Sequence, residues 1–494
     1  MNSSCLIAIL VAAAVVLCLA RASGCGESVV TELASVNERT TCSIPKHQDK
    51  KAKISLLFNN SLGKILGEEV NERLELLGTV SDSTVHLERT FMGPAHRRAA
   101  SMIREWMKDA GMVAWVDSVG NVRGRTPDST AKSKGKAKEP ALLIGSHYDT
   151  VIDGGKFDGA LGIVVGIAAV KALILEQGEN LTKPVEVVAF SDEEGVRFQS
   201  TFLGSRALCG TLLSDEEAMN VRDKTGMTIV DALKDAGLIE NWGNISGAAA
   251  DAGAFGGYLE VHIEQGPVLE DAGIPLGVVS GIAGQSWLAI SVNGEQGHAG
   301  TVPMGLRKDP MAGAASIISG IEALCRRKAS HEDGSLVCTV GSLQMWPGAS
   351  NVIPSTVNFT VDVRSLSDAV RDHVVDSIHM LTDSACQERR LTCSLSLNHW
   401  ARAISSDSKL TSMLSDSIPQ VHGVDTCPLA MQPLSLASGA GHDAIAIAGI
   451  APISMLFVRC KEGMSHTPRE WADPKDVGLS AAVILEFLKK WQRS

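Results

Sequence analysis

The chain has 494 residues, of which 45% are hydrophobic and 20% are charged, and its formal net charge is −11. This composition is typical of a globular protein long enough for two domains, and it excludes an intrinsically disordered chain. The acidic balance and the lack of a long basic run in the sequence argue against nucleic acid as a partner.

The N-terminal segment predicts a secretory signal peptide. Residues 6–20 are continuously apolar, and Ala20-Arg21-Ala22 is a small-x-small cleavage pattern, so the peptide is expected at residues 1–22. The apolar run is short for a membrane span, and no later run is expected to reach that length. The first residues lack Lys and Arg, which leaves an uncleaved anchor as the alternative. Secretory entry would make the Asn-x-Ser/Thr sequons candidates for glycosylation; they begin at Asn59, Asn180, Asn244 and Asn358.

The cysteines do not predict a disulfide framework. Eleven are present, and Cys5 and Cys18 lie in the predicted signal peptide. The remaining nine are an odd number, widely spaced and without a Cys-x-x-Cys pair. Cys25 and Cys42 are candidates for one pair near the mature N-terminus, and the others are expected to be small core residues or free thiols.

The first half of the chain alternates between predicted helices and strands. Helices are expected at residues 54–77, 95–110, 160–175 and 228–236, and strands at 113–122, 142–147, 184–190 and 257–263. Residues 203–213 predict a loop or short helix. The Lys-, Ser- and Gly-rich segment 126–139 predicts a solvated loop, with a basic binding segment as the alternative. Alternation of this kind is typical of a mixed or parallel α/β sheet.

The pattern changes near Leu276. Strands at 287–292, 336–344, 355–364 and 392–399, with helices at 310–326 and 368–388, give a βαββαβ order. This order predicts a small α+β domain of the split-βαβ, ferredoxin-like type. The α/β character returns from Ile404, with helices at 410–417 and 482–492 and a strand at 452–458. The expected organisation is therefore a large α/β domain at 54–275 and 398–494, with the small domain inserted at 276–397.

Five residues that end or follow apolar strands could bind metal together; they are His147, Asp158, Glu194, His262 and His466. The carboxyl ends of strands in an open α/β sheet meet at one edge, where ligands bind. Imidazole and carboxylate without thiolate suit Zn, Mn or Fe and argue against a closed structural zinc site. Asp158 is the natural bridge between two ions, and ions about 3.5–4 Å apart can activate a water and stabilise an oxyanion. Each residue alone is more typical of ordinary structure, so the prediction depends on the combination.

Three further carboxylates lie next to these candidates. Asp149 comes two residues after His147, which in a strand places both on one face. We expect Asp149 to accept the second ring N–H of His147 and to fix its tautomer. Glu193 and Glu194 are adjacent and cannot share a role, so one can bind metal while the other stays free as a general base. The alternative for this acidic cluster is a solvated loop or a helix N-terminus.

Several residues outside this cluster are candidates for substrate contact. His298 lies in a glycine-flanked turn of the small domain, and a plain turn is its alternative. Asn351 and Arg364 flank or lie in the adjacent strands. Arg364 could clamp a carboxylate in bidentate fashion or make a surface ion pair. Gly441 and His442 belong to a second glycine-flanked loop, for which a plain turn is equally expected.

The motifs GSHYDT, GKFDGALG, SDEEGVRF, EVHIEQGP, GHAGTVP and GMSHTP occur in this order, and together they resemble the M20 metallopeptidase-type amidohydrolases. The resemblance spans roughly residue 95 to the C-terminus. HIEQGP and SNVIPSTVNFTVDVR resemble the branch that acts on ureido and carbamoyl compounds. The resemblance implies hydrolysis of a C–N bond in a small-molecule ureide, with allantoate as the expected substrate in purine nitrogen recycling. Ureidoglycolate and N-carbamoyl amino acids are the alternatives, and a non-catalytic metal-binding dimer is the alternative from another class.

The resemblance also implies a role for each candidate. The five metal candidates would hold two divalent ions, with Mn²⁺ expected first and Zn²⁺ as the alternative, and with Asp158 bridging. Glu193 would be the general base and Asp149 the carboxylate that orients the histidine. His298 would be a lid histidine that reaches the partner subunit's site and stabilises the oxyanion. The implied substrate-binding residues are Asn351, Arg364, Gln265, Gly441 and His442. The implied assembly is a homodimer through the small lid domain, and the implied location is the endoplasmic reticulum.

Overall fold

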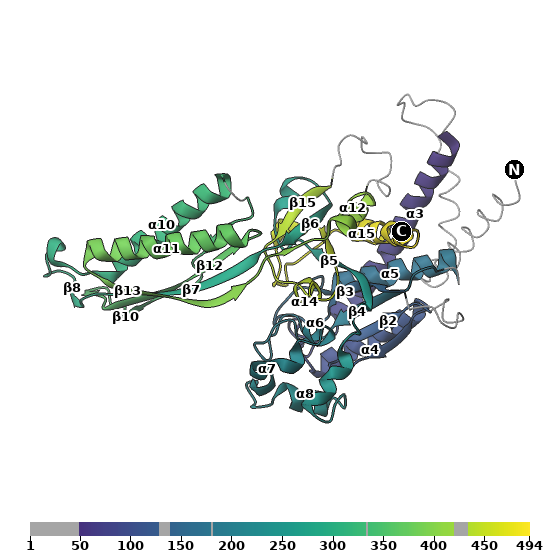
Figure 1. Cartoon of the computed structure of the whole chain (residues 1–494), viewed down its shortest axis with the longest axis horizontal. Helices are drawn as coiled ribbons and strands as arrows, with labels where there is room; N and C mark the ends of the chain where they lie inside the picture. The colour runs from purple at the N-terminus through teal and green to yellow at the C-terminus, as the bar shows by residue number, and fades with distance from the viewer. Residues whose placement is uncertain (1–48, 128–138, 179–180, 332–333, 419–432) are drawn as a thin grey trace, which may run out of the picture. The chain divides into compact units, whose positions relative to one another are not determined.

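The computed structural model describes residues 49–127, 139–178, 181–331, 334–418 and 433–494, with side chains from residue 64 onward (Figure 1). The predicted signal peptide, with the pairing considered for Cys25 and Cys42, lies outside the described residues. The chain forms two compact units. Unit 1 holds the described residues of Met1–Val279, Ser406–Leu436 and His442–Ser494, and unit 2 holds those of Ser280–Ser405 and Ala437–Gly441.

The large sheet is mixed, as the sequence predicts. Its strands follow the order β1-β2-β4-β3-β5-β16-β6-β14, and β15 pairs with β6. The four central strands β4, β3, β5 and β16 are mutually parallel, whereas β1, β2, β6 and β14 join antiparallel. The carboxyl ends of the four central strands therefore lie at one edge. The bounds are β1 Val113–Val116, β2 Val122–Arg125, β3 Ala141–His147, β4 Val185–Phe190, β5 Phe255–Ile263, β6 Leu276–Ile282, β14 Ile404–Ser405, β15 Leu434–Ser438 and β16 Ile453–Val458.

Four long helices cover unit 1: α3 (Asp49–Gly78), α4 (Pro94–Asp109), α5 (Ala160–Gln177) and α15 (Pro474–Trp491). Helix α5 packs on β3, β4 and β5, and α3 and α15 pack on α5. Contrary to the expectation, α5 is long and apolar enough to cross a membrane, but 72% of it is buried in the protein, which is typical of a core helix. The shorter helices of unit 1 are α6 Leu203–Leu208, η2 Leu212–Ser214, α7 Glu216–Asn220, α8 Ile229–Asp235, η3 Trp242–Ala248, α9 Val268–Asp271, α12 Ser408–Ser415, α14 Ala444–Ile447 and η5 Lys461–Gly463.

The strand predicted at 113–122 is instead a hairpin of β1 and β2. The Asp117 carboxylate accepts hydrogen bonds from the backbone N–H groups of Val119 and Asn121, both at 3.0 Å. Gly120 has a φ of +87°, which a glycine adopts without steric cost. The side chain and the glycine thus form a turn inside a segment whose alternating pattern predicts one continuous strand. The C-terminal helix is also longer than predicted, because Asp473 caps it and Pro474 occupies its first turn.

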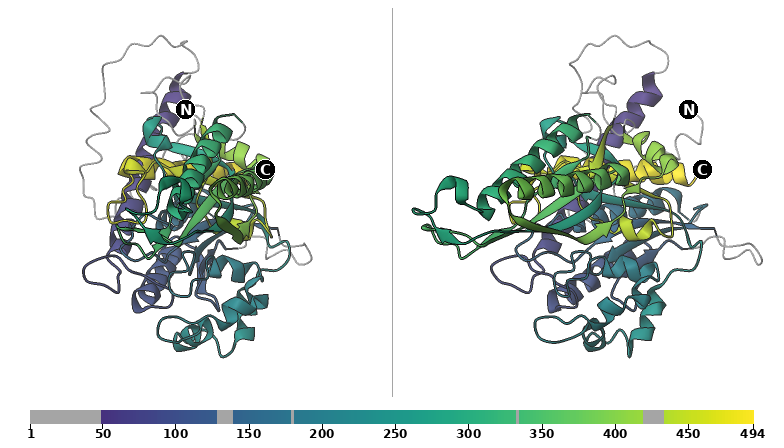
Figure 2. Two further views of the ribbon diagram at one scale, coloured as in Figure 1. Left: turned by 90° about the vertical axis from the view of Figure 1, so that its left-hand side faces the viewer. Right: turned by 60° about the vertical axis from the view of Figure 1, so that its left-hand side comes forward.

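Unit 2 is an antiparallel sheet in the order β10-β12-β7-β13, with α10 and α11 packed together against it (Figures 1 and 2). Its inward-facing residues alternate along β12, where every second side chain is buried. The predicted strand 336–344 is two separate strands, β9 and β10, which pair with different parts of β12. The bounds are β7 Gly284–Asn293, β8 Gly297–His298, η4 Met304–Leu306, α10 Pro310–His331, β9 Val337–Thr339, β10 Leu343–Trp346, β11 Val352–Ile353, β12 Thr356–Ser365, α11 Asp368–Arg389 and β13 Thr392–Ala401.

The expectation that the cysteines form no framework is wrong for unit 2. Cys325 pairs with Cys338, and Cys386 pairs with Cys393. Each pair joins a helix to the strand that follows it, and the Cα atoms of each pair are 6.2 Å apart. The return of the chain from helix to strand creates this proximity, which sequence spacing does not reveal. Cys209 and Cys460 are free thiols, as expected.

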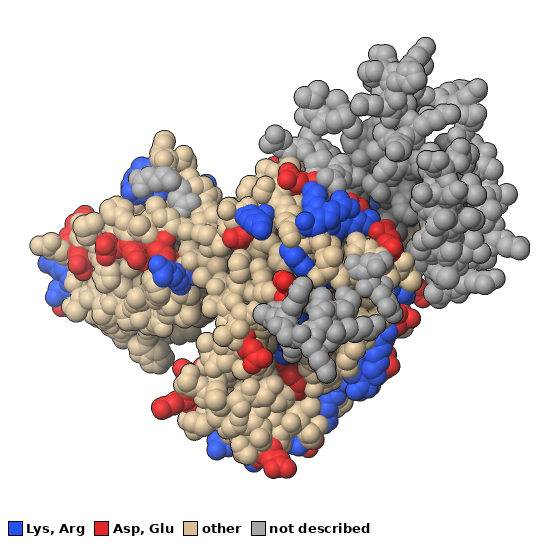
Figure 3. Space-filling view, turned by 45° about the vertical axis from the view of Figure 1, so that its right-hand side comes forward, with Lys and Arg blue, Asp and Glu red and all other residues tan. Residues whose placement is uncertain are grey.

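Basic and acidic side chains are interspersed on the face shown in Figure 3. Ion pairs of unit 1 include Lys171 with Glu69 at 3.0 Å and with Asp109 at 2.7 Å.

Candidate metal centre

The four parallel strands deliver the predicted metal ligands to one edge of the sheet. His147 ends β3, Glu194 follows β4, and His262 lies next to the end of β5. His466 follows β16, and Asp158 lies in the loop between β3 and α5. The structure brings all five side chains together within unit 1.

Asp158 lies at the centre of the cluster, and its two carboxylate oxygens face different partners. Oδ1 lies 3.5 Å from His147 Nε2 and 3.1 Å from His262 Nε2. Oδ2 lies 3.2 Å from His466 Nε2, and the same nitrogen is 3.1 Å from Glu194 Oε1. Two sets of donors therefore share one carboxylate, which is the arrangement a bridging ligand requires.

The donor atoms fit a pair of divalent ions. The donor atoms of His147, Asp158 and His262 lie within 4.8 Å of one another, and so do those of Asp158, Glu194 and His466. Imidazole and carboxylate donors without sulfur suit Mn²⁺ or Zn²⁺. His147, His262 and Asp158 would hold one ion, and Glu194, His466 and Asp158 would hold the other.

Gly159 makes room for this arrangement. Its φ is +64°, and a Cβ at this position would lie 2.4 Å from Nε2 of the His147 imidazole. Only glycine combines this backbone conformation with so close an approach to the ring. The glycine that opens α5 is therefore part of the geometry of the centre.

The carboxylates and imidazoles of the cluster shift each other's protonation. Burial opposes the ionisation of Asp158, but hydrogen bonds from His147, His262 and His466 hold its pKa well below the usual value. Hydrogen bonds to Asp158 and Glu194 raise the pKa of His466 to about 10. The pKa of His147 is also raised, because its contacts with Asp149 and Asp158 outweigh burial. Without metal, these histidines hold protons that an ion must displace.

Asp149 and Glu193, the predicted orienting carboxylate and general base, both lie beside the metal candidates. Asp149 Oδ1 lies 3.3 Å from His147 Nδ1, so the carboxylate contacts the ring nitrogen that faces away from Asp158. Glu193 is buried, and burial together with the nearby carboxylate of Glu194 raises the pKa of Glu193 well above its usual value. A carboxyl group with a raised pKa takes and returns a proton readily near neutral pH.

Two buried residues that the sequence analysis missed support the strand ends. Arg89 donates through Nε to the carbonyl of Tyr148 at 2.5 Å and through Nη1 to that of Leu77 at 2.9 Å. The His96 Nε2 contacts the carbonyl of Ser191 at 2.5 Å, and burial lowers the pKa of His96 to about 4, so its ring is neutral. The sequence around Arg89 looks like that of a surface arginine, and the sequence around His96 looks like that of an ordinary helix histidine. No sequence signal therefore pointed to either residue.

Glu260 is a third residue that was missed. Its carboxylate accepts hydrogen bonds from Ser146 Oγ at 2.8 Å and from the Ala444 N–H at 3.1 Å. It thereby ties β5 to the residue before His147 and to the start of α14. The period-2 rule could have found it, because Glu260 and His262 share one face of a strand whose other side chains are apolar.

Two of the predicted substrate-binding residues lie beside the metal candidates in unit 1. Gln265 donates through Nε2 to Asp158 Oδ2 at 3.0 Å, and its buried Oε1 has no hydrogen-bond partner among the described residues. A free acceptor at this position is available to a ligand N–H. The His442 ring is buried, and its centroid is 4.6 Å from that of His262.

The remaining candidates belong to unit 2. His298 is exposed on β8, where its Nδ1 accepts the Gly300 N–H at 3.0 Å. Asn351 accepts the Ala299 N–H at 2.9 Å through its carbonyl, so His298 and Asn351 lie on adjoining segments. Arg364 donates to the carbonyl of Gly439 at 2.7 Å.

Arg364 also pairs with Asp362, with Nη2 2.7 Å from Oδ2. The ion pair that was the alternative reading of Arg364 is therefore present. The contact with Gly439 places the guanidinium beside the predicted loop that contains Gly441. Within unit 2 the structure thus forms two groups of candidates, one with His298 and Asn351 and one with Arg364 and Gly441.

A mixed α/β sheet with parallel central strands, and a carboxylate shared by two donor sets at the carboxyl ends of those strands, are typical of a metal-dependent hydrolase. Residues 143–490 match the profile described as Peptidase family M20/M25/M40. The chain belongs to this family.

The chain is similar to named hydrolases that act on C–N bonds. It is 48% identical over 441 residues to allantoate deiminase of Arabidopsis thaliana, covering 86% of this chain and 82% of that protein. It is 39% identical over 435 residues to N-carbamoyl-L-amino acid amidohydrolase of Geobacillus stearothermophilus, covering 87% and 98% respectively. The chain is accordingly an enzyme of the hydrolase class.

Solved structures share the fold. A hydantoinase/carbamoylase family amidase from Burkholderia ambifaria superimposes with a TM-score of 0.75 at 29% identity, covering 86% of this chain and 97% of that one. AtUAH in complex with (S)-hydroxyglycine gives a TM-score of 0.67 at 28% identity, covering 87% and 98%.

Proposed function

We propose that this enzyme hydrolyses allantoate to ureidoglycine, ammonia and carbon dioxide with the help of two divalent ions. The observation that carries the proposal is the division of Asp158 between two donor sets, with Glu193 beside them. The relatives named allantoate deiminase, at 45–48% identity over most of the chain, support allantoate as the substrate. The reaction serves the recycling of ureide nitrogen.

The residues around the metal centre would have separate roles in one hydrolytic step. Bound ions supply Lewis acidity and make a water acidic enough to lose a proton near neutral pH. Glu193 accepts a proton from the water that attacks the ureido carbonyl and delivers it to the leaving nitrogen. Asp149 holds the Glu193 backbone and the His147 ring in place. The carbamate that leaves breaks down to ammonia and carbon dioxide.

Residues of unit 2 would bind the substrate and its developing charge. The Nδ1 of His298 accepts an amide hydrogen, so the neutral ring carries its proton on Nε2 and presents a donor. A donor of this kind stabilises an oxyanion. Arg364 would bind the substrate carboxylate after exchanging its contact with Asp362, and Asn351 would bind a ureido group. Gln265, Gly441 and His442 would supply further contacts.

A second candidate is hydrolysis of an N-carbamoyl-L-amino acid. The relative from Geobacillus stearothermophilus carries that name and is 39% identical. Ureidoglycolate is a further substrate of the same chemical type. All three contain a carbamoyl nitrogen and a carboxylate, so the same metal centre and the same arginine would serve each of them.

The deciding experiment is a substrate panel. Purified protein preincubated with Mn²⁺ is mixed with allantoate and ammonia is followed, with chelated protein as the control. About one ammonia per allantoate, released only with metal, supports the proposal. No release from allantoate by metal-loaded, folded protein contradicts it, and ammonia from ureidoglycolate or an N-carbamoyl amino acid would then assign the sister activity. Inactivity on the whole panel would favour the non-catalytic dimer. Repeating the assay with Zn²⁺ decides which ion supports turnover.

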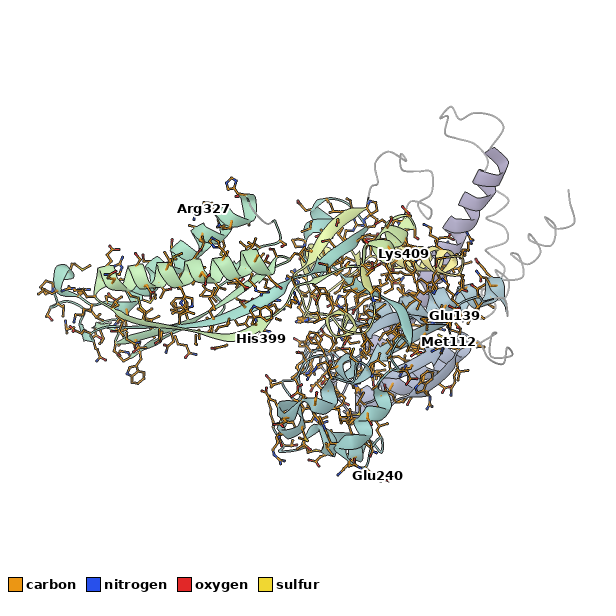
Figure 4. All side chains as sticks on the ribbon, in the orientation of Figure 1. Met112, Glu139, Glu240, Arg327, His399 and Lys409 are labelled. Carbon is orange, nitrogen blue, oxygen red and sulfur yellow. A yellow bond between two sulfur atoms is a disulfide. The ribbon has the colours of Figure 1, made fainter. Side chains whose placement is uncertain are left out.

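We also propose that unit 2 mediates a homodimer. It exposes large apolar side chains, among them Trp346 at 70% and Trp400 at 49%. Trp287 is also partly exposed, and its ring lies against that of His399, labelled in Figure 4, with the centroids 4.5 Å apart and the planes tilted by 40°. Apolar surface of this kind is typical of a protein interface. Light scattering should give twice the chain mass, and a monomer at micromolar concentration would contradict the proposal.

Entry into the secretory pathway is a further proposal, with the endoplasmic reticulum as the location. The two disulfides of unit 2 support it, because disulfides persist in oxidising compartments. Asn244 and Asn358 are both exposed and are therefore open to glycosylation, whereas the side chains of Asn59 and Asn180 are outside the described part. N-terminal sequencing of protein from a eukaryotic host should begin after Ala22, and a glycosidase should lower its mass. A retained Met1 and an unchanged mass would contradict this localisation.

A further inference from the structure

Glu470 is a buried carboxylate that joins the two loops of unit 1 that carry Asp158 and His466. It is 4% exposed, and its Oε1 accepts the backbone N–H groups of Phe157 at 2.8 Å and Asp158 at 3.0 Å. Its Oε2 accepts a hydrogen bond from the Ser465 hydroxyl at 3.1 Å. One side chain thus contacts the backbone of the bridging residue and the residue before the histidine.

The two loops are also packed closely around this carboxylate. A Cβ on Gly155 would lie 2.2 Å from the Glu470 carboxyl carbon, so the glycine leaves the space that the carboxylate fills. Trp471 packs edge-on against Phe157 with ring centroids 5.7 Å apart. Ser465 Oγ also lies 2.8 Å from Asp158 Oδ2, so the hydroxyl contacts both carboxylates.

His466 needs this support more than the two histidines His147 and His262 do. His147 and His262 lie in strands, where the sheet fixes the backbone. His466 lies in a loop after β16, its φ is +57°, and its side chain is half exposed. A non-glycine residue in the left-handed region is strained and is held there by its surroundings.

We propose that Glu470 is a positioning residue for the second metal site. By accepting two consecutive amides of one loop and a hydroxyl of the other, it fixes the distance between Asp158 and His466 before an ion binds. The inference rests on the two-ion centre of the proposed function and goes beyond it by naming a residue that binds neither metal nor substrate. Partners that hold metal ligands in place typically change metal affinity or activity by about 10–100-fold when removed.

The chain contains a matched control at its C-terminus. Gln492, which is 7% exposed, accepts through Oε1 the amides of Thr182 and Lys183 at 2.8 and 3.0 Å. It also accepts the Thr182 hydroxyl at 3.0 Å. Both side chains accept two consecutive amides and a hydroxyl, but the groups that Gln492 holds belong to one segment, Thr182 and Lys183, which carries no metal candidate. Loss of either side chain costs stability, whereas only loss of Glu470 should change metal binding.

The test is a calorimetric titration of the metal-free full-length protein with Mn²⁺ alone, on the parent and the variants Glu470→Ala, Glu470→Gln and Gln492→Ala. We expect Glu470→Ala to bind one Mn²⁺ as the parent does and the second at least about tenfold more weakly. Glu470→Gln keeps an acceptor oxygen for the two amides and should stay within about threefold of the parent. Gln492→Ala should melt earlier than the parent but bind both ions with parental affinity.

Three results would overturn the inference. They are parental affinity for both ions in Glu470→Ala, an equal loss of affinity in Glu470→Gln and Glu470→Ala, and a comparable loss in Gln492→Ala. Mn²⁺ binding is measured without substrate, so it decides the role of Glu470 whether or not allantoate is hydrolysed. Failure of the proposed activity would instead appear as parent protein that binds two ions and releases no ammonia from allantoate.

Discussion

The Asp149 carboxylate accepts the backbone N–H of Glu193 through Oδ1 at 3.0 Å. Its other oxygen accepts the N–H of Glu194 at 3.2 Å. Asp149, which we predict to orient His147, therefore also holds the start of the loop that carries Glu193 and Glu194. Because β3 and β4 are parallel neighbours, one carboxylate at the end of the first strand reaches the backbone after the second.

Glu193→Gln should retain metal and fold but lose turnover. Glutamine fills the same space and keeps the backbone bonds to Asp149, but it cannot accept the proton of the attacking water. A general base contributes about 10²–10⁴-fold, so we expect kcat to fall by this amount. Metal content and melting temperature, measured beside kcat, check that only the base is lost. Parental turnover in this variant would show that another group is the base.

His298→Ala should lower turnover without loss of metal. The residue lies in unit 2, away in sequence from the five metal candidates, and its Nδ1 accepts the Gly300 N–H, which leaves Nε2 as the proposed donor. Removal of one oxyanion donor typically costs about 10²–10³ in kcat. His373, an exposed histidine of α11, supplies the control, and His373→Ala should behave as the parent. Metal analysis that finds less than the parental content in His298→Ala would contradict its assignment to the lid.

Metal uptake should release protons and become tighter as pH rises. In metal-free protein the pKa of His466 is about 10, so its ring is protonated at pH 7–8 and an ion must displace that proton. For each proton displaced, the apparent affinity for the metal ion should rise about tenfold with every unit increase in pH, until the pH reaches the pKa. Calorimetric titration in buffers of different ionisation enthalpy gives the number of protons. A heat of binding that does not depend on the buffer would rule out this linkage.

The same shift predicts how stability depends on pH without metal. The pKa of His466 is raised on folding, so its contribution is fully present below the unfolded value of 6.5 and is lost as pH rises through about 10. Metal-free parent should therefore exceed His466→Ala in melting temperature at pH 6 by more than at pH 10. A constant difference would contradict the raised pKa.

Gly159→Ala should abolish binding of the first ion. The new Cβ would lie 2.4 Å from the His147 ring and would displace a ligand. Gly178 is the control, because it also has a positive φ, of +60°, but a Cβ there meets nothing within 4 Å. Both substitutions place alanine in a backbone conformation that costs about 1–3 kcal/mol, so a difference in Mn²⁺ affinity between them reports the collision. Equal affinities in the two variants would show that the ring can move aside.

Where the sequence predictions fail, local geometry is the cause. The turn at Asp117 divides an alternating run into two strands because a side chain bonds to the backbone two and four residues ahead. Cys325 and Cys338 pair because a helix returns the chain to a strand beside it. Neither the turn nor the disulfide changes the hydrophobic pattern, so the periodicity of the sequence cannot predict them.

The sequence by itself determined the α/β class, the inserted small domain and the five metal candidates that end or follow strands. Their apolar periodicity and turn chemistry are local properties, and parallel strands necessarily place their carboxyl ends together. Only the tertiary structure decided how Asp158 divides its two oxygens and which buried groups hold its loop. Glu470 is more than 300 residues from Phe157 and Asp158 in the chain. Contacts of that range depend on how loops pack after the sheet has formed, and no short pattern encodes them.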